Sequence, residues 1–85
     1  MNTYEQFRTP ISNTLKNIRE RRGLTQLRLA EYLQVSQGAL NHWESGKTGI
    51  PAEKLMLFLQ MTRTPPNDFF KIMISYMDTE EVVEK

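Results

Sequence analysis

The sequence contains no cysteine and only one histidine among its 85 residues. Disulfides and thiolate metal sites are therefore excluded, and one imidazole cannot build a histidine-rich metal cluster. No apolar run is long enough to span a membrane, and the N-terminal segment lacks the basic and apolar regions of a signal peptide. These absences predict a cytoplasmic protein that needs no metal or other cofactor.

Catalytic signatures are also missing. The chain has no glycine-rich phosphate loop, no paired-carboxylate motif and no nucleophile motif. A domain of this size also has little room to build and desolvate a catalytic site. We therefore expect a binding protein, not an enzyme.

Charge is unevenly distributed along the chain. Residues 1–63 include nine basic and five acidic side chains, a net charge of +4, whereas residues 64–85 include two basic and five acidic ones, a net charge of −3. This asymmetry fits a body that faces a polyanion and a C-terminal segment turned away from it. Ordinary solubilising charge explains it equally well.

The helical patterns begin after an N-terminal arm, which we expect over residues 1–9. Thr9-Pro10 is typical of a helix start with proline at the first helical position, and Gly23 is typical of its end. The amphipathic spacing of four, three and four residues is carried by Ile11, Leu15, Ile18 and Arg22. The other side of this helix carries Lys16, Arg19 and Arg21.

Three further helices are predicted from capping residues and inward-facing apolar positions. Thr25 and Ser36 are good N-caps for the second and third helices, the third stops at Gly46, and Pro51 opens the fourth. The inward positions in the three helices are Leu29, Ala30 and Leu33, then Leu40 and Trp43, then Ala52, Leu55, Phe58 and Leu59. No strand pattern is convincing, so the predicted fold class is all-α.

The last helix, expected to begin near Pro66, is too apolar for one face. Lys71 and Ser75 are the only polar interruptions between residues 69 and 77. We expect it to contact a second copy of the chain, with extra monomer core as the alternative. The expected interface residues are Phe69, Phe70, Met73, Ile74, Tyr76 and Met77. Residues 78–85 form an acidic tail that we expect to be frayed, so the predicted domain covers residues 10–77.

The segment Thr25–Gly46 is the most informative part of the chain. It predicts two short helices joined by a tight turn, and the second helix carries Gln37, Asn41 and His42 on the side opposite Leu40 and Trp43. Amide side chains can pair bidentately with base edges in the major groove of DNA. This pattern favours a DNA-binding helix-turn-helix.

The chain resembles the Cro/phage-repressor (XRE-type) helix-turn-helix family at this segment, and the resemblance extends over about residues 12–70. The shared patterns are Leu15-x-x-Ile18-Arg19-x-x-Arg22-Gly23-Leu24-Thr25-Gln26, Leu29-Ala30-x-x-Leu33-x-Val35-Ser36 and Trp43-Glu44-x-Gly46-Lys47. The resemblance implies a compact five-helix, lambda-repressor-like domain. It also implies a protein that reads double-stranded operator DNA, usually as a homodimer.

The resemblance also assigns roles to individual positions. Those that would face bases are Gln37, Gly38, Asn41 and His42. Those that would contact phosphates are Gln26, Ser36, Ser45, Lys47 and Thr48, and we add Arg28 because it lies near the start of the second helix. Gln26 would in addition brace Gln37, the first side chain of the recognition helix.

Several positions have simpler explanations or depart from the family pattern. Gln37 could merely cap its helix, His42 could be a plain surface histidine, and Trp43 favours a core position over a stacking platform. Gly38 removes a side chain where a base is often read, so specificity could depend on fewer contacts or on close backbone approach. Leu27 and Tyr32 occupy positions that are commonly polar, and residues 49–51 lack the basic residues that some members place there.

We therefore expect a sequence-specific transcriptional regulator, a repressor of the phage, plasmid or restriction–modification type. It would bind an inverted-repeat operator as a homodimer through the recognition helix, residues 37–45. The alternative is an antitoxin or other protein-interaction module, in which the apolar C-terminal helix binds a small protein partner such as a toxin and DNA binding serves autoregulation.

Overall fold

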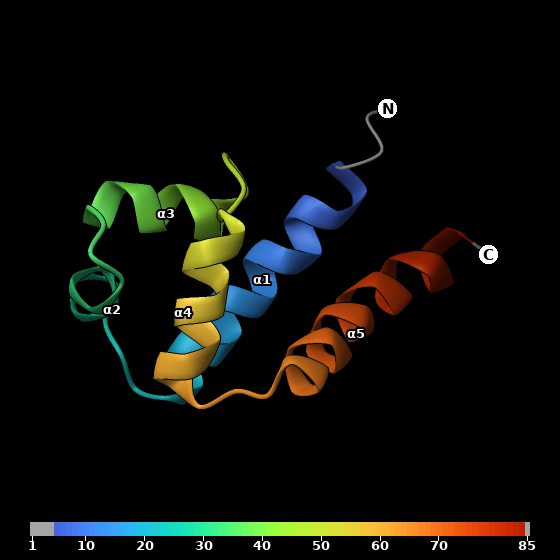
Figure 1. Cartoon of the computed structure of the whole chain (residues 1–85). Helices are drawn as coiled ribbons and strands as arrows, with labels where there is room; N and C mark the ends of the chain where they lie inside the picture. Colours follow the sequence, from blue (N-terminus) through green and yellow to red (C-terminus); the bar gives the residue numbers. More distant parts are fainter. Residues whose placement is uncertain (1–4, 85) are drawn as a thin grey trace.

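The computed structural model describes the backbone of residues 5–84 and the side chains of residues 6–77. The described chain contains no strand and forms α1 (Glu5–Arg21), α2 (Gln26–Leu33), α3 (Gln37–Ser45), α4 (Ala52–Thr62) and α5 (Pro66–Glu84). The predicted all-α, five-helix fold is confirmed. Helix α1 runs through the middle of the molecule, with α2 and α3 on one side and α5 on the other (Figure 1).

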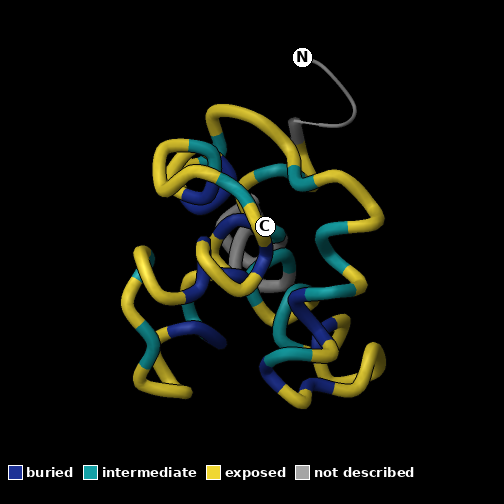
Figure 2. Tube along the Cα trace, turned by 60° about the vertical axis from the view of Figure 1, so that its left-hand side comes forward, coloured by how far each residue is buried: buried dark blue, intermediate teal, exposed yellow. Residues whose placement is uncertain are grey.

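The core is assembled around α1, which packs against both α3 and α5, while α2 packs against α3 and α4. Its buried apolar residues are Leu15, Ile18, Leu29, Ala30, Leu33, Leu40, Trp43, Phe58, Leu59 and Phe69. These residues come from all five helices, so dark segments are interspersed with exposed ones along the trace (Figure 2). Each fully buried leucine or phenylalanine contributes about 1.5–3 kcal/mol relative to exposure.

The predicted caps of the helix-turn-helix are confirmed. The Thr25 hydroxyl accepts a hydrogen bond from the Arg28 N–H at 3.1 Å, and the Ser36 hydroxyl accepts one from the Ala39 N–H at 3.0 Å. Helix α3 ends at Gly46, which has a φ of 83° and so adopts a left-handed conformation that favours glycine. These local signals fix where α3 begins and ends.

The predicted start of the first helix is wrong. Helix α1 begins at Glu5, and Pro10 lies inside it, so residues 5–9 of the expected arm are helical. Pro10 is the sixth residue of α1, so its missing N–H removes one helical hydrogen bond close to the start of the helix. The Pro10 side chain is fully buried, and its packing offsets that loss. Residues 1–4 lie outside the described residues.

Two other expectations need correction. Ala52 and Arg22 are exposed and not inward-facing, Ala52 because it begins α4 at the surface. The backbone of α5 stays helical to Glu84 through most of the segment expected to be a frayed tail, whose side chains lie outside the described residues. None of the described helices combines the length and apolar character needed to cross a bilayer.

Candidate nucleic-acid interface

Helix α3 divides its side chains between the core and the solvent. Leu40 and Trp43 are buried, whereas Gln37, Asn41 and His42 are exposed. The exposed residues recur at spacings that place them on one side of a helix. Helix α3 lies at the edge of the molecule (Figure 1), and the exposure of these side chains places the polar side toward the solvent.

Gly38 lies on the same outward side as the three polar residues. A Cβ atom at this position would meet only the Ser36 hydroxyl, at 3.9 Å, and its φ is outside the left-handed region. The fold therefore does not require glycine here. The missing side chain leaves bare backbone beside Gln37.

The residues expected to contact phosphates lie at the two ends of α3 and on α2. At the end of α3, the Lys47 and Thr48 N–H groups donate to the His42 carbonyl at 2.9 and 3.3 Å, and the Ser45 hydroxyl donates to the same oxygen at 3.3 Å. These bonds fold the loop back over the helix end. The exposed members of the set are Arg28, Ser36, Ser45, Lys47 and Thr48.

A buried ion pair between α1 and α3 supports this face. The Arg19 Nε donates to Glu44 Oε2 at 2.7 Å, and Nη2 donates to Oε1 at 3.1 Å. The Arg19 Nη1 donates to the Leu24 carbonyl at 2.7 Å, and the two side chains are only 10% and 3% exposed. The guanidinium and the carboxylate therefore satisfy each other away from water.

Our placement of Arg19 on the outer side of its helix was wrong, and the sequence holds a signal that could have corrected it. Arg19 is four residues after Leu15 and next to Ile18, and Glu44 is four residues after Leu40 and next to Trp43. Both charges therefore border the inner stripes of their helices, with opposite signs. Such a pair is buried because each charge compensates the other.

Gln26, which is half-buried at the start of α2, joins the ion pair to the exposed face. Its Nε2 donates to Glu44 Oε1 at 3.0 Å and to Asn41 Oδ1 at 3.3 Å. The expected brace between Gln26 and Gln37 is not formed, because the Gln26 amide is hydrogen-bonded to Glu44, two turns further along α3 than Gln37. Gln37 makes no side-chain hydrogen bond within the described part of the chain, so its amide stays free to pair with an outside partner.

The Gln26 amide nitrogen has no hydrogen left for the expected phosphate contact. An amide nitrogen carries two hydrogens, and both are used inside the protein. A phosphate could still be met by the backbone N–H groups at the start of α2, which lack intrahelical partners.

One side of α5 packs against the core of the monomer, and another side is exposed. Phe69 is only 2% exposed and belongs to the core, Met73 packs partly against it, and the Tyr76 hydroxyl accepts a hydrogen bond from Asn17 Nδ2 at 3.3 Å. Phe70 and Ile74, one helical turn apart, are 51% and 47% exposed. The six expected interface residues are therefore split, and Phe69 is a monomer core residue.

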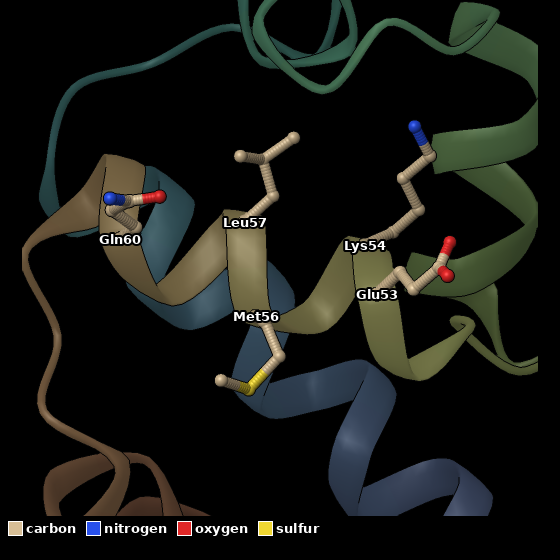
Figure 3. Close-up of a pocket in the computed structure, with 5 residues that line it drawn as sticks. All are labelled: Glu53, Lys54, Met56, Leu57 and Gln60. Atoms are coloured by element: carbon tan, nitrogen blue, oxygen red, sulfur yellow. The ribbon is translucent and has the colours of Figure 1, made fainter.

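One further surface feature of the described chain is a hollow on α4. A hollow of about 460 Å³ on α4 is lined by residues of that helix alone, Glu53, Lys54, Met56, Leu57 and Gln60, whose side chains spread apart (Figure 3). Lys54 Nζ is held by the Leu33 carbonyl at 2.9 Å. Within residues 6–77, no three histidine, aspartate or glutamate side chains gather as a metal site would require.

Comparison with known proteins agrees with this geometry. The sequence model of the Helix-turn-helix family matches residues 15–69, which is more than half of the chain. The clp gene regulator ClgR from Corynebacterium glutamicum superposes with a TM-score of 0.85 at 24% identity, over 92% of this chain and 83% of that one. A mutant of the Restriction-Modification Controller Protein C.Esp1396I superposes with a TM-score of 0.76 at 21% identity, over 91% and 95% of the two chains. No curated protein sequence matches the chain.

Proposed function

Because this chain belongs to the XRE-type helix-turn-helix family of DNA-binding transcriptional regulators, we propose that it represses transcription by binding an inverted-repeat operator as a homodimer. The observation that carries the proposal is the outward side of α3, where Gln37, Asn41 and His42 are exposed opposite a buried stripe. The proposed repressor is of the phage, plasmid or restriction–modification type.

Base reading is proposed for the outward side of α3. The major groove is wide enough to admit a helix, and a glutamine amide matches the N7 acceptor and the N6 donor of adenine. Gln37 is the first residue of α3, where recognition helices meet base edges, and its side chain makes no hydrogen bond to another described residue. His42 and the bare backbone of Gly38 complete the reading surface beside Asn41.

Phosphate contacts are proposed for the flanks of α3. Lys47 and Thr48 lie in the loop after the helix, Ser36 and Ser45 lie at its two ends, and Arg28 is exposed on α2. Contacts on both sides would fix the orientation of the helix in the groove without reading sequence. They would also make the affinity fall as salt rises, because each neutralised phosphate releases counterions.

Dimerisation is proposed through the free side of α5. Exposed Phe70 and Ile74 form an apolar pair that two chains could bury around a two-fold axis. Two copies related in this way would place their α3 helices in successive major grooves, about 34 Å apart. The same exposed pair favours a second candidate, in which a small protein such as a toxin covers α5 and DNA binding regulates expression of the pair.

A selection experiment tests the proposal. Purified protein is mixed with fragments of genomic DNA at physiological salt, and the retained fragments are sequenced. We expect an enriched inverted repeat with half-sites about one helical turn apart. Retention without sequence preference would contradict operator reading. Co-purification of a small unrelated protein that prevents self-association would favour the second candidate.

A further inference from the structure

We propose that the buried Arg19–Glu44 pair, acting through Gln26, orients the Asn41 amide so that Asn41 turns its donor nitrogen toward base edges and therefore favours guanine over adenine. This inference rests on the proposed function, because it requires α3 to enter the major groove. Gln26 is then a positioning residue for the base contact that Asn41 makes.

The chain of contacts begins at a carboxylate whose orientation is fixed. Glu44 accepts from Arg19 Nε at its Oε2, at 2.7 Å, and from Arg19 Nη2 at its Oε1, at 3.1 Å. The Glu44 side chain is 3% exposed, and Arg19 is itself anchored to the Leu24 carbonyl. The Oε1 atom therefore stays where it meets α2, and as part of an ionised carboxylate it can only accept hydrogen bonds.

Glu44 determines which way the Gln26 amide points. The Gln26 atom that lies 3.0 Å from Glu44 Oε1 must be the nitrogen, because an amide oxygen there would face a carboxylate oxygen with no hydrogen between them. The second hydrogen of the same nitrogen points to Asn41. Turning this amide over would break two hydrogen bonds at once.

Gln26 in turn determines which way the Asn41 amide points. The Asn41 atom that lies 3.3 Å from Gln26 Nε2 must be the oxygen, since two amide nitrogens would oppose donor to donor. The Asn41 nitrogen, with its two hydrogens, is then the group left for a partner outside the protein. Asn41 is exposed on the outward side of α3, so those donors face the proposed groove.

Turning the amide nitrogen outward changes which base Asn41 reads best. A free asparagine pairs with adenine by donating to N7 and accepting from the N6 amino group. The Asn41 oxygen is turned toward Gln26 and keeps only one further lone pair, so the adenine amino group would meet a poorly placed acceptor. Guanine presents two neighbouring acceptors, N7 and O6, which suit the two hydrogens of one amide nitrogen.

The test compares three variants on operator duplexes obtained by selection. Asn41→Ala identifies the base pair that Asn41 reads, as the position where preference is lost. Gln26→Met keeps the length of the side chain and removes the donor, and Gln60→Met is the matched control because Gln60 is exposed on α4, away from α3. Thermal melting followed by circular dichroism verifies that all three variants fold.

At that base pair we expect the wild-type protein to prefer guanine over adenine by about fivefold, the size expected for one net hydrogen bond. Gln26→Met should reduce the preference to near equality by freeing Asn41 to pair with adenine, whereas Gln60→Met should leave it unchanged. Three outcomes would each overturn the inference: adenine preference in the wild type, unchanged preference in Gln26→Met, or no effect of Asn41→Ala at any position. None of the three would contradict the proposed function. A wild-type protein with no sequence preference at all would overturn both.

Discussion

Gln37 and Lys47 differ in what they can contribute to DNA binding, although both are exposed at the candidate interface. Gln37 offers an amide to base edges, whereas Lys47 offers a point charge to the backbone. We expect Gln37→Ala to lower discrimination between operator and mismatched DNA by about 1–3 kcal/mol. Lys47→Ala should weaken operator and random DNA about equally and reduce the slope of the salt dependence by about one.

Fluorescence anisotropy with operator and random duplexes at several salt concentrations measures both effects. Lys47→Ala serves as the comparison for Gln37→Ala, since it removes a side chain from the same surface. Equal losses on operator and random DNA for Gln37→Ala would mean that Gln37 does not read bases.

The Arg19–Glu44 pair should matter for stability as well as for orientation. Glu44→Ala leaves the Arg19 charge buried without its partner, which should lower the free energy of unfolding by about 3–5 kcal/mol. Replacing both residues by apolar ones, as in Arg19→Met with Glu44→Leu, should cost much less because no charge is then buried. Urea unfolding followed by circular dichroism measures both, with Glu31→Ala at an exposed position of α2 as the control. A loss for Glu44→Ala no larger than for the control would show that the pair is not buried in solution.

At the scale of the helices, the prediction about dimerisation concerns α5. Ile74→Asp places a charge in the exposed apolar pair with Phe70, so we expect it to shift the protein from dimer to monomer without unfolding it. Met56→Asp is the matched control, because Met56 is even more exposed but lies on α4. Sedimentation equilibrium measures the association constant. A wild-type protein that is monomeric at high concentration, or loss of the dimer in the control alone, would contradict this assignment.

The helix boundaries could be predicted where the deciding interactions are local. Thr25 and Ser36 cap helices through hydrogen bonds to residues three positions away, and Gly46 ends α3 through its own left-handed conformation. Sequence spacing alone determines such contacts. The buried stripes of α2 and α3 were predicted for the same reason, since helical periodicity separates their inner and outer sides.

What could not be predicted depends on contacts between distant segments. Arg19 and Glu44 are 25 positions apart, so their pairing follows only once α1 and α3 are packed together. The contact of Gln26 with Asn41, in place of the expected Gln37, follows from that pairing. Pro10 misled the prediction of the first helix because tertiary burial outweighs a local preference for the first helical position.

The whole molecule carries the proposed DNA-reading surface on α3 and the proposed self-association surface on α5. Helix α1 lies between them, because it packs against α3 on one side and α5 on the other (Figure 1). A shared rigid helix would hold the two recognition helices of a dimer at a fixed separation. The spacing of the half-sites in the operator is therefore a property of the whole assembly.

The most direct test of this account is a hydroxyl-radical footprint of the wild-type protein on an operator obtained by selection. We predict two equivalent patches of protection on one face of the duplex, related by the two-fold symmetry of the site and centred about one helical turn apart. A single unsymmetrical patch, or uniform protection along the fragment, would contradict the proposal that two copies place their α3 helices in successive major grooves.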